Sequence, residues 1–129
     1  GTVTGVQTCA LPICISDFVT FLQSTESYRR DLRRAEYGDE RDPALRAFFG
    51  EISPVRNASR ITRPLFAAAG ANDPRVPNSE TEQIVRAVRA NGQDVWYLVF
   101  GDEGHGFYKK PNVDYFDAAA ALFWQGHLL

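Results

Sequence analysis

The segment LFAAAGANDPRVP, residues 65–77, joins a small apolar run to a polar loop. The run from Leu65 to Ala69 is short and lies between Pro64 and Gly70, so it predicts a buried strand rather than a helix. Turn-forming residues and one carboxylate, Asp73, follow it directly. In open parallel sheets, ligands and catalytic groups gather at the carboxyl ends of the strands. The segment therefore predicts both a strand and a candidate functional loop.

A second strand followed by a polar loop comes later in the chain. Residues 95–100, VWYLVF, form an unbroken apolar and β-branched run, which is typical of a strand covered on both faces. Residues 101–110 then form a loop that contains Gly104-His105-Gly106. A helical pattern separates the two strands and another follows the second. This alternation predicts an α/β fold, with parallel strands, flanking helices and right-handed crossovers.

The helices show recognisable signals at their ends. Asn78 or Ser79 is expected to cap the helix between the strands, because both side chains can accept from a free backbone N–H. A final helix is expected from about Asn112. Upstream, Ser16-Asp17 can cap a short helix, and Pro43 fits the first turn of another. The final helix should carry an apolar side made of Tyr115, Ala118, Ala119, Leu122 and Phe123.

Asp73 and His105 are expected to lie close together, because neighbouring parallel strands end at the same edge of a sheet. A carboxylate that accepts from the imidazole Nδ1–H fixes the tautomer and stabilises the imidazolium during proton transfer. The glycines beside His105 permit a tight loop and leave the ring open to substrate. Taken singly, each residue could be structural, since an Asp before Pro is most often a turn former. Their joint placement predicts an acid and a general base.

Several motifs together resemble the C-terminal catalytic segment of the prolyl oligopeptidase family, with the acylaminoacyl-peptidase-like branch fitting best. This family consists of serine peptidases with an α/β-hydrolase catalytic domain, and the resemblance runs from about Ile15 to the end of the chain. The matching stretches are GANDPRVP at 70–77, WYL at 96–98, DEGHGF at 102–107 and Ser53-Pro54.

The resemblance implies roles for individual residues. It makes Asp73 the acid and His105 the general base of a Ser-His-Asp triad. It implies that Arg75 holds a substrate carbonyl and that Val76 borders the pocket for the side chain beside the cleaved bond. Further pocket residues implied in this way are Phe18, Phe21 and Tyr28. The expected substrates are short peptides or acyl-peptides.

The family's nucleophile lies in a Gly-x-Ser-x-Gly elbow, and no such motif occurs in the sequence. Residues 3–13, VTGVQTCALPI, resemble the translation of a sequencing adaptor. We therefore expect residues 1–14 to be non-native and residues 15–129 to be part of a peptidase catalytic domain that is inactive on its own. Both cysteines, Cys9 and Cys14, lie in the segment set aside, which leaves the cellular compartment open.

Composition narrows the possible partners. A net charge of −2 gives no field that favours nucleic acid or an acidic membrane, and no apolar run is long enough to span a bilayer. Asp102, Glu103 and His105 could be imagined as metal ligands, but no further ligand cluster supports this. We expect no metal and no cofactor. The oligomeric state stays open.

Two alternatives remain to the peptidase interpretation. An esterase, thioesterase or lactone hydrolase of the same fold would need the same acid and base. A non-catalytic binding module could retain the fold without the chemistry. A serine elbow upstream would favour the enzymes, and its absence there would favour the module.

Overall fold

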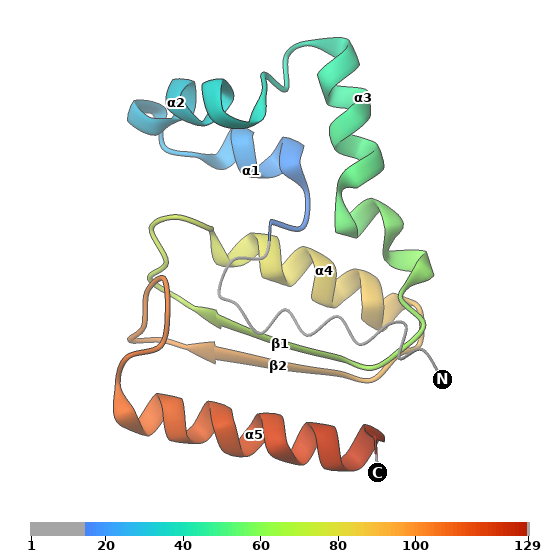
Figure 1. Ribbon diagram of the computed structural model, residues 1–129, viewed down its shortest axis with the longest axis vertical. Helices are drawn as coiled ribbons and strands as arrows, with labels where there is room; N and C mark the ends of the chain where they lie inside the picture. Colours follow the sequence, from blue (N-terminus) through green and yellow to red (C-terminus); the bar gives the residue numbers. More distant parts are fainter. Residues whose placement is uncertain (1–14, 129) are drawn as a thin grey trace.

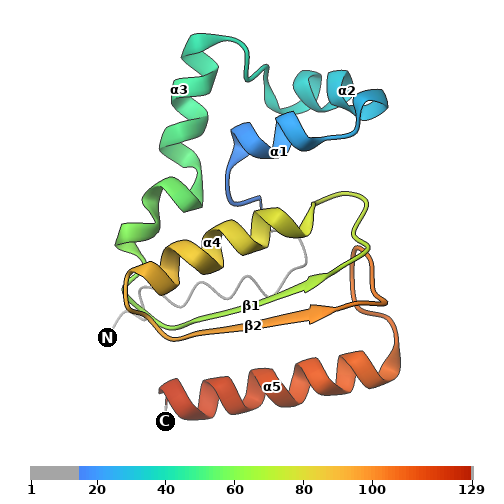
Figure 2. The same ribbon diagram turned by 180° about the vertical axis from the view of Figure 1, so that it is seen from behind.

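The computed structural model describes residues 15–128 and shows parallel strands with flanking helices (Figure 1). Strands β1 (Leu65–Gly70) and β2 (Val95–Phe100) pair in parallel. Helix α4 (Asn78–Ala90) lies on one side of this pair and helix α5 (Lys110–Leu128) on the other (Figures 1 and 2). The predicted α/β class and both strands are confirmed, although β1 extends one residue past the predicted run and includes Gly70.

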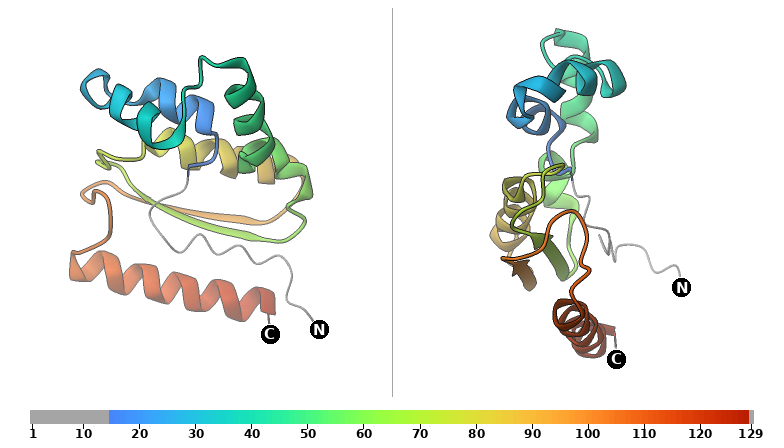
Figure 3. Two further views of the ribbon diagram at one scale, coloured as in Figure 1. Left: turned by 45° about the horizontal axis from the view of Figure 1, so that its top comes forward. Right: turned by 90° about the vertical axis from the view of Figure 1, so that its left-hand side faces the viewer.

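The first half of the described chain is helical. It contains α1 (Phe18–Ser24), α2 (Ser27–Tyr37), α3 (Pro43–Ile52) and a 3₁₀ helix, η1 (Pro54–Arg60). Helices α1 to α3 lie beyond α4, on the side away from the sheet (Figure 3). The expectation that residues 1–14 are non-native falls outside the described residues.

Strand β1 is covered on both faces because its side chains alternate. Leu65 and Ala67 point toward α4 and join a buried cluster that includes Val88. Phe66 points the other way, and its ring centroid lies 5.5 Å from that of Phe123 in α5. The short apolar run thus forms the middle layer between two helices.

The two helices cover the sheet unequally, and the burial expected on α5 and β2 is incomplete. Helix α5 begins at Lys110 rather than near Asn112, and Phe123 is its one buried residue among those described. Two residues of its predicted apolar side, Tyr115 and Leu122, are 62% and 58% exposed. Strand β2 is not covered throughout, since Val99 is 43% exposed. A sheet with two described strands is too narrow to bury a whole helix face.

The predicted cap of α4 was wrong. Pro77 occupies the capping position, and no side chain caps the helix. The Asn78 side chain accepts instead from the Tyr97 hydroxyl at 2.6 Å and donates to Glu82 at 3.3 Å. In contrast, Asp17 caps α1 as predicted, because its carboxylate accepts from two backbone N–H groups of the first turn.

A buried carboxylate attaches the helical region to α4. Glu80, fully buried in the first turn of α4, accepts from the backbone N–H groups of Ser16 at 3.1 Å and Asp17 at 3.0 Å. It also accepts from the Thr20 hydroxyl at 2.7 Å. These contacts fix the start of α1 against α4, just after the loop that carries Asp73.

Candidate active site

The loops that follow β1 and β2 start at the same level of the sheet. The two strands pair in register, so that Gly70 lies opposite Phe100, and both loops leave from one edge (Figure 1). Backbone hydrogen bonds continue past the strands, from Ala71 N–H to the Phe100 carbonyl and from Asn72 N–H to the Glu103 carbonyl, both at 3.0 Å. The register therefore brings the predicted acid and base side by side.

Asp73 is oriented by its own loop. Its Oδ1 accepts from the backbone N–H groups of Arg75 at 2.8 Å and Val76 at 3.0 Å. Its Oδ2 lies 2.9 Å from Nδ1 of His105, and its side chain is 5% exposed. Because the backbone occupies one carboxylate oxygen, the other is left directed at the imidazole.

The two ring nitrogens of His105 have different surroundings. A carboxylate accepts hydrogen bonds, so the contact with Asp73 places the proton on Nδ1 and leaves the Nε2 lone pair available. Among residues 15–128, Nε2 has no hydrogen-bond partner. The side chain is 16% exposed. The arrangement can therefore accept a proton from a group placed beside Nε2.

The His105 loop is tightly constrained. Glu103 is buried beneath it, and its Oε1 accepts from the backbone N–H groups of Tyr108 at 3.2 Å and Lys109 at 2.8 Å. A hydrogen bond from Asn112 is the largest cause that holds the pKa of the Glu103 carboxyl below its usual range. Gly106 has φ +119°, a conformation that side-chain-bearing residues rarely adopt.

Gly70 lets the two loops approach each other closely. A Cβ at this position would overlap the Gly104 carbonyl oxygen and would lie 2.7 Å from the Glu103 carbonyl oxygen. The end of β1 is thus in contact with the backbone just before His105. From the sequence alone, Gly70 is a strand terminator and Glu103 a rejected metal ligand, and each also lies in a motif of the family resemblance. The Glu103 side chain instead contacts residues five to nine positions ahead in an irregular loop, and Gly70 contacts the backbone of the other loop, so neither contact follows a helix or strand period.

The residues predicted to contact substrate differ in how much of each is exposed to solvent. Arg75 is exposed, and its backbone N–H holds Asp73. Val76 is 7% exposed and packs in a buried cluster that includes Phe21. Phe18 is half-buried beside this cluster, whereas Tyr28 is 80% exposed. Thus Arg75 is free to meet a ligand, while Val76 contacts the helical region.

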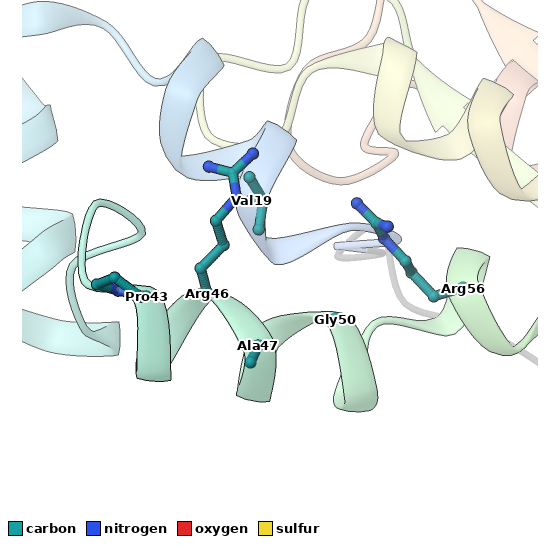
Figure 4. Close-up of a pocket in the computed structure, with 6 residues that line it drawn as sticks. All are labelled: Val19, Pro43, Arg46, Ala47, Gly50 and Arg56. Atoms are coloured by element: carbon teal, nitrogen blue, oxygen red, sulfur yellow. The ribbon is translucent and has the colours of Figure 1, made fainter.

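A pocket of about 450 Å³ lies elsewhere, between α1 and α3 (Figure 4). Its lining residues are Val19, Pro43, Arg46, Ala47, Gly50 and Arg56. None of them belongs to the loops of Asp73 or His105, so this pocket is separate from the acid–base pair. Within residues 15–128, no group of three or more His, Cys, Asp or Glu side chains is arranged to hold a metal ion. No helix of this part is long and apolar enough to cross a membrane.

Parallel strands with an acid and a histidine in successive loops at their carboxyl edge are typical of the C-terminal part of an α/β-hydrolase domain. A solved puromycin-hydrolyzing peptidase from Mycobacterium tuberculosis superposes on the chain with a TM-score of 0.72. The match covers 86% of this chain and 17% of that one, at 30% sequence identity. The chain therefore has part of an α/β-hydrolase fold.

The family follows from the sequence comparison. A model of the prolyl oligopeptidase family matches residues 12–129, and the chain belongs to that family. It is 43% identical over 86 residues to dipeptidyl aminopeptidase BIII of Pseudoxanthomonas mexicana, covering 67% of this chain and 12% of that enzyme. It is 36% identical over 67 residues to the acylamino-acid-releasing enzyme of Arabidopsis thaliana, covering 52% of this chain and 9% of that enzyme. The chain thus spans a small part of the relatives it matches.

Proposed function

We propose that this chain supplies the acid and the general base of a serine peptidase that cleaves short peptides or acyl-peptides. The observation that carries the proposal is the 2.9 Å contact between His105 Nδ1 and Asp73 Oδ2, with Oδ1 held by the backbone. Structural turns need no such pairing between residues 32 positions apart. Membership of a peptidase family supports the same chemistry.

In the proposed reaction, a serine hydroxyl attacks the substrate carbonyl while Nε2 of His105 takes its proton. The imidazolium returns this proton to the leaving amine, and an acyl-enzyme remains. Water then attacks the acyl group, again with His105 as the base, and releases the acid and the free serine. Asp73 stabilises the imidazolium in both halves.

The proposal also assigns the substrate contacts and the nucleophile. The exposed guanidinium of Arg75, next to the acid loop, would hold a substrate carbonyl, and Val76 would border the pocket beside the cleaved bond. The serine would come from a longer polypeptide, because the 129 residues contain no Gly-x-Ser-x-Gly motif. The chain alone would then be inactive, since loss of a triad nucleophile costs about 10⁶ in turnover.

A chimera tests the proposal. Residues 15–129 replace the matching C-terminal segment of P. mexicana dipeptidyl aminopeptidase BIII, which provides the remainder of a related enzyme. Peptide hydrolysis by the chimera should fall by about 10⁶ with His105→Ala, and Arg46→Ala, in the separate pocket, serves as the control. Full peptidase activity with His105→Ala would remove His105 from the mechanism.

Two further assays define the limits of the proposal. The 129-residue chain should not react with a fluorophosphonate probe, and labelling of one of its serines would overturn the claim that the nucleophile lies elsewhere. A panel of peptide and ester substrates on the chimera separates peptidase from esterase. Hydrolysis of esters without any peptide hydrolysis would favour the esterase alternative.

A further inference from the structure

Glu103 closes the loop that carries His105. Glu103 precedes His105 by two residues, and its side chain extends to the part of the loop that follows His105. There its Oε1 accepts hydrogen bonds from the backbone N–H groups of Tyr108 at 3.2 Å and Lys109 at 2.8 Å. The same oxygen accepts from the Asn112 amide at 3.0 Å. The residue is 4% exposed. One buried side chain thus joins both ends of the segment around the imidazole.

The backbone of Glu103 faces the other catalytic loop. Its carbonyl accepts from Asn72 N–H at 3.0 Å, one residue before Asp73. The next carbonyl, that of Gly104, lies in the space that a side chain at Gly70 would fill. Glu103 is therefore attached to the acid loop through its main chain and to the far end of the histidine loop through its side chain.

The neighbouring carboxylate, Asp102, provides a contrast. Its side chain is 57% exposed and pairs with Lys109 Nζ at 2.7 Å. It also accepts from the Asn112 amide at 2.9 Å. These are contacts between side chains at the surface, which solvent weakens. Asp102 holds no backbone N–H of the loop among the described contacts, so its removal should leave the loop's path unchanged.

We propose that Glu103 is a positioning residue, which directs the imidazole of His105 toward Asp73 by fixing the backbone of residues 103–109. It touches neither substrate nor the reacting atoms, and its catalytic meaning rests on the proposed function. Hydrogen bonds to an ionised carboxylate are roughly twice as strong as neutral ones. The Asn112 amide and the two backbone donors lower the pKa of Glu103, which keeps its carboxylate charged at neutral pH.

The test uses NMR on the complete 129-residue chain. A His ring N–H that donates to a carboxylate gives a proton resonance far downfield. Because His127 Nε2 also lies 2.9 Å from a carboxylate oxygen, that of Asp94, every sample carries His127→Gln, so that the remaining resonance reports the contact between His105 and Asp73. Hydrogen exchange of the Tyr108 and Lys109 backbone amides reports their hydrogen bonds to the Glu103 carboxylate. The variants are Glu103→Ala, which removes the acceptor, and Glu103→Gln, which keeps an oxygen but loses the charge. Asp102→Ala is the matched control.

Glu103→Ala should abolish the downfield resonance and speed exchange of the two amides by about tenfold or more. Glu103→Gln should give a smaller acceleration, and Asp102→Ala should leave both signals unchanged. If Glu103→Ala unfolds the chain, Glu103→Gln decides. An unchanged resonance and unchanged exchange in a folded Glu103 variant would overturn the positioning role.

Failure of this inference is distinguishable from failure of the proposed function. Asp73→Asn should remove the downfield resonance, because His105 then loses its charged acceptor. If the resonance is absent from the unaltered chain or survives Asp73→Asn, the pairing that underlies the proposed function is refuted. If it disappears in Asp73→Asn but persists in Glu103→Ala, only the role of Glu103 is refuted.

Discussion

The loops of Asp73 and His105 leave the same edge of the sheet but are held in different ways. Asp73 is fixed by the two residues that follow its neighbour Pro74, whose backbone N–H groups bind Oδ1. The His105 loop is held by groups spread over a longer part of the chain, from Gly70 to Asn112. It depends on the buried carboxylate of Glu103 and on the bare Cα of Gly70.

The two loops of one site are thus stabilised differently. Backbone groups of the adjacent turn hold Asp73, whereas contacts of Glu103 and Gly70 hold the His105 loop. In the proposed mechanism the acid, Asp73, needs only a fixed direction, which a tight turn encoded in its own sequence can supply. The proposed general base, His105, must also present its second nitrogen at a defined place, so the path of its whole loop matters. We therefore expect substitutions in the two loops to fail in different ways.

Among substitutions that leave His105 in place, the largest effect is expected where the two loops meet. In the chimera with P. mexicana dipeptidyl aminopeptidase BIII, Asp73→Asn keeps an oxygen for the backbone donors but removes the charge that pairs with His105. The corresponding change in another serine protease lowers kcat by about 10⁴. Peptide hydrolysis at saturating substrate measures it. The variant should unfold near the temperature of the parent, and a kcat that is not reduced would deny Asp73 its role as the acid.

Gly70→Ala should have the next largest effect, because its methyl group would clash with the backbone of the His105 loop. The new methyl group would overlap the Gly104 carbonyl, and a backbone obstacle cannot rotate away. Overpacking of this kind costs about 1–3 kcal/mol. Thermal or urea unfolding measures the loss, and the downfield His105 proton should disappear with it.

Gly104→Ala is the matched control for that substitution. A Cβ there would meet its nearest atom, the Asn72 carbonyl oxygen, at an ordinary 3.6 Å. Its free energy of unfolding should change by no more than about 0.5 kcal/mol. Equal losses for Gly70→Ala and Gly104→Ala would show that general crowding, and not the approach of the loop to β1, limits this edge.

The sequence predicted the strands and the proximity of Asp73 to His105, but it did not predict the contacts that hold the His105 loop. The apolar runs predicted both strands to within one residue, and the strand ends predicted that Asp73 lies near His105. The contacts of Gly70 were missed because they join positions that become neighbours only after the strands have paired in register. Those of the Glu103 side chain were missed because they lie in an irregular loop, which has no sequence period to reveal them.

The errors have a common cause. Asn78 was expected to cap α4, but the Tyr97 hydroxyl on β2 competes for its side-chain oxygen. The apolar side of α5 was expected to be buried, yet Tyr115 and Leu122 extend beyond the narrow sheet. Local preferences predicted the elements, whereas partners from elsewhere in the chain decided the use of individual side chains.

Gly106→Ala should have a smaller effect than Gly70→Ala. Its φ of +119° is unfavourable for alanine, which costs about 1–3 kcal/mol. A Cβ would also meet the Tyr108 ring at 2.8 Å, but that side chain is 83% exposed and can move. We therefore expect the lower end of the range in unfolding experiments. Gly101→Ala, with no atom near its Cβ, should be neutral, and a comparable loss there would argue against backbone strain at Gly106.

The smallest effect is expected from acid, and it should be confined to the His105 loop. The pKa of Glu103 is lowered from its ordinary 4.5, mainly by Asn112 and then by the backbone N–H groups it accepts. A carboxylate whose pKa is lower in the folded state stabilises that state fully above the unfolded value, and this stabilisation is lost as the pH falls through the folded pKa. Exchange protection of the Tyr108 and Lys109 amides should therefore be complete above about pH 4.5 and decline below it.

The Ala71 amide provides an internal reference for this titration, because it donates to the Phe100 carbonyl, which does not titrate. Its protection should persist at pH values where the Lys109 amide has begun to exchange. In Glu103→Gln the loss of Tyr108 and Lys109 protection at low pH should vanish, since the glutamine side chain does not titrate. If the loss persists in that variant, a carboxylate other than Glu103 governs the loop, and the contrast between a locally held acid and a clamped histidine must be redrawn around that group.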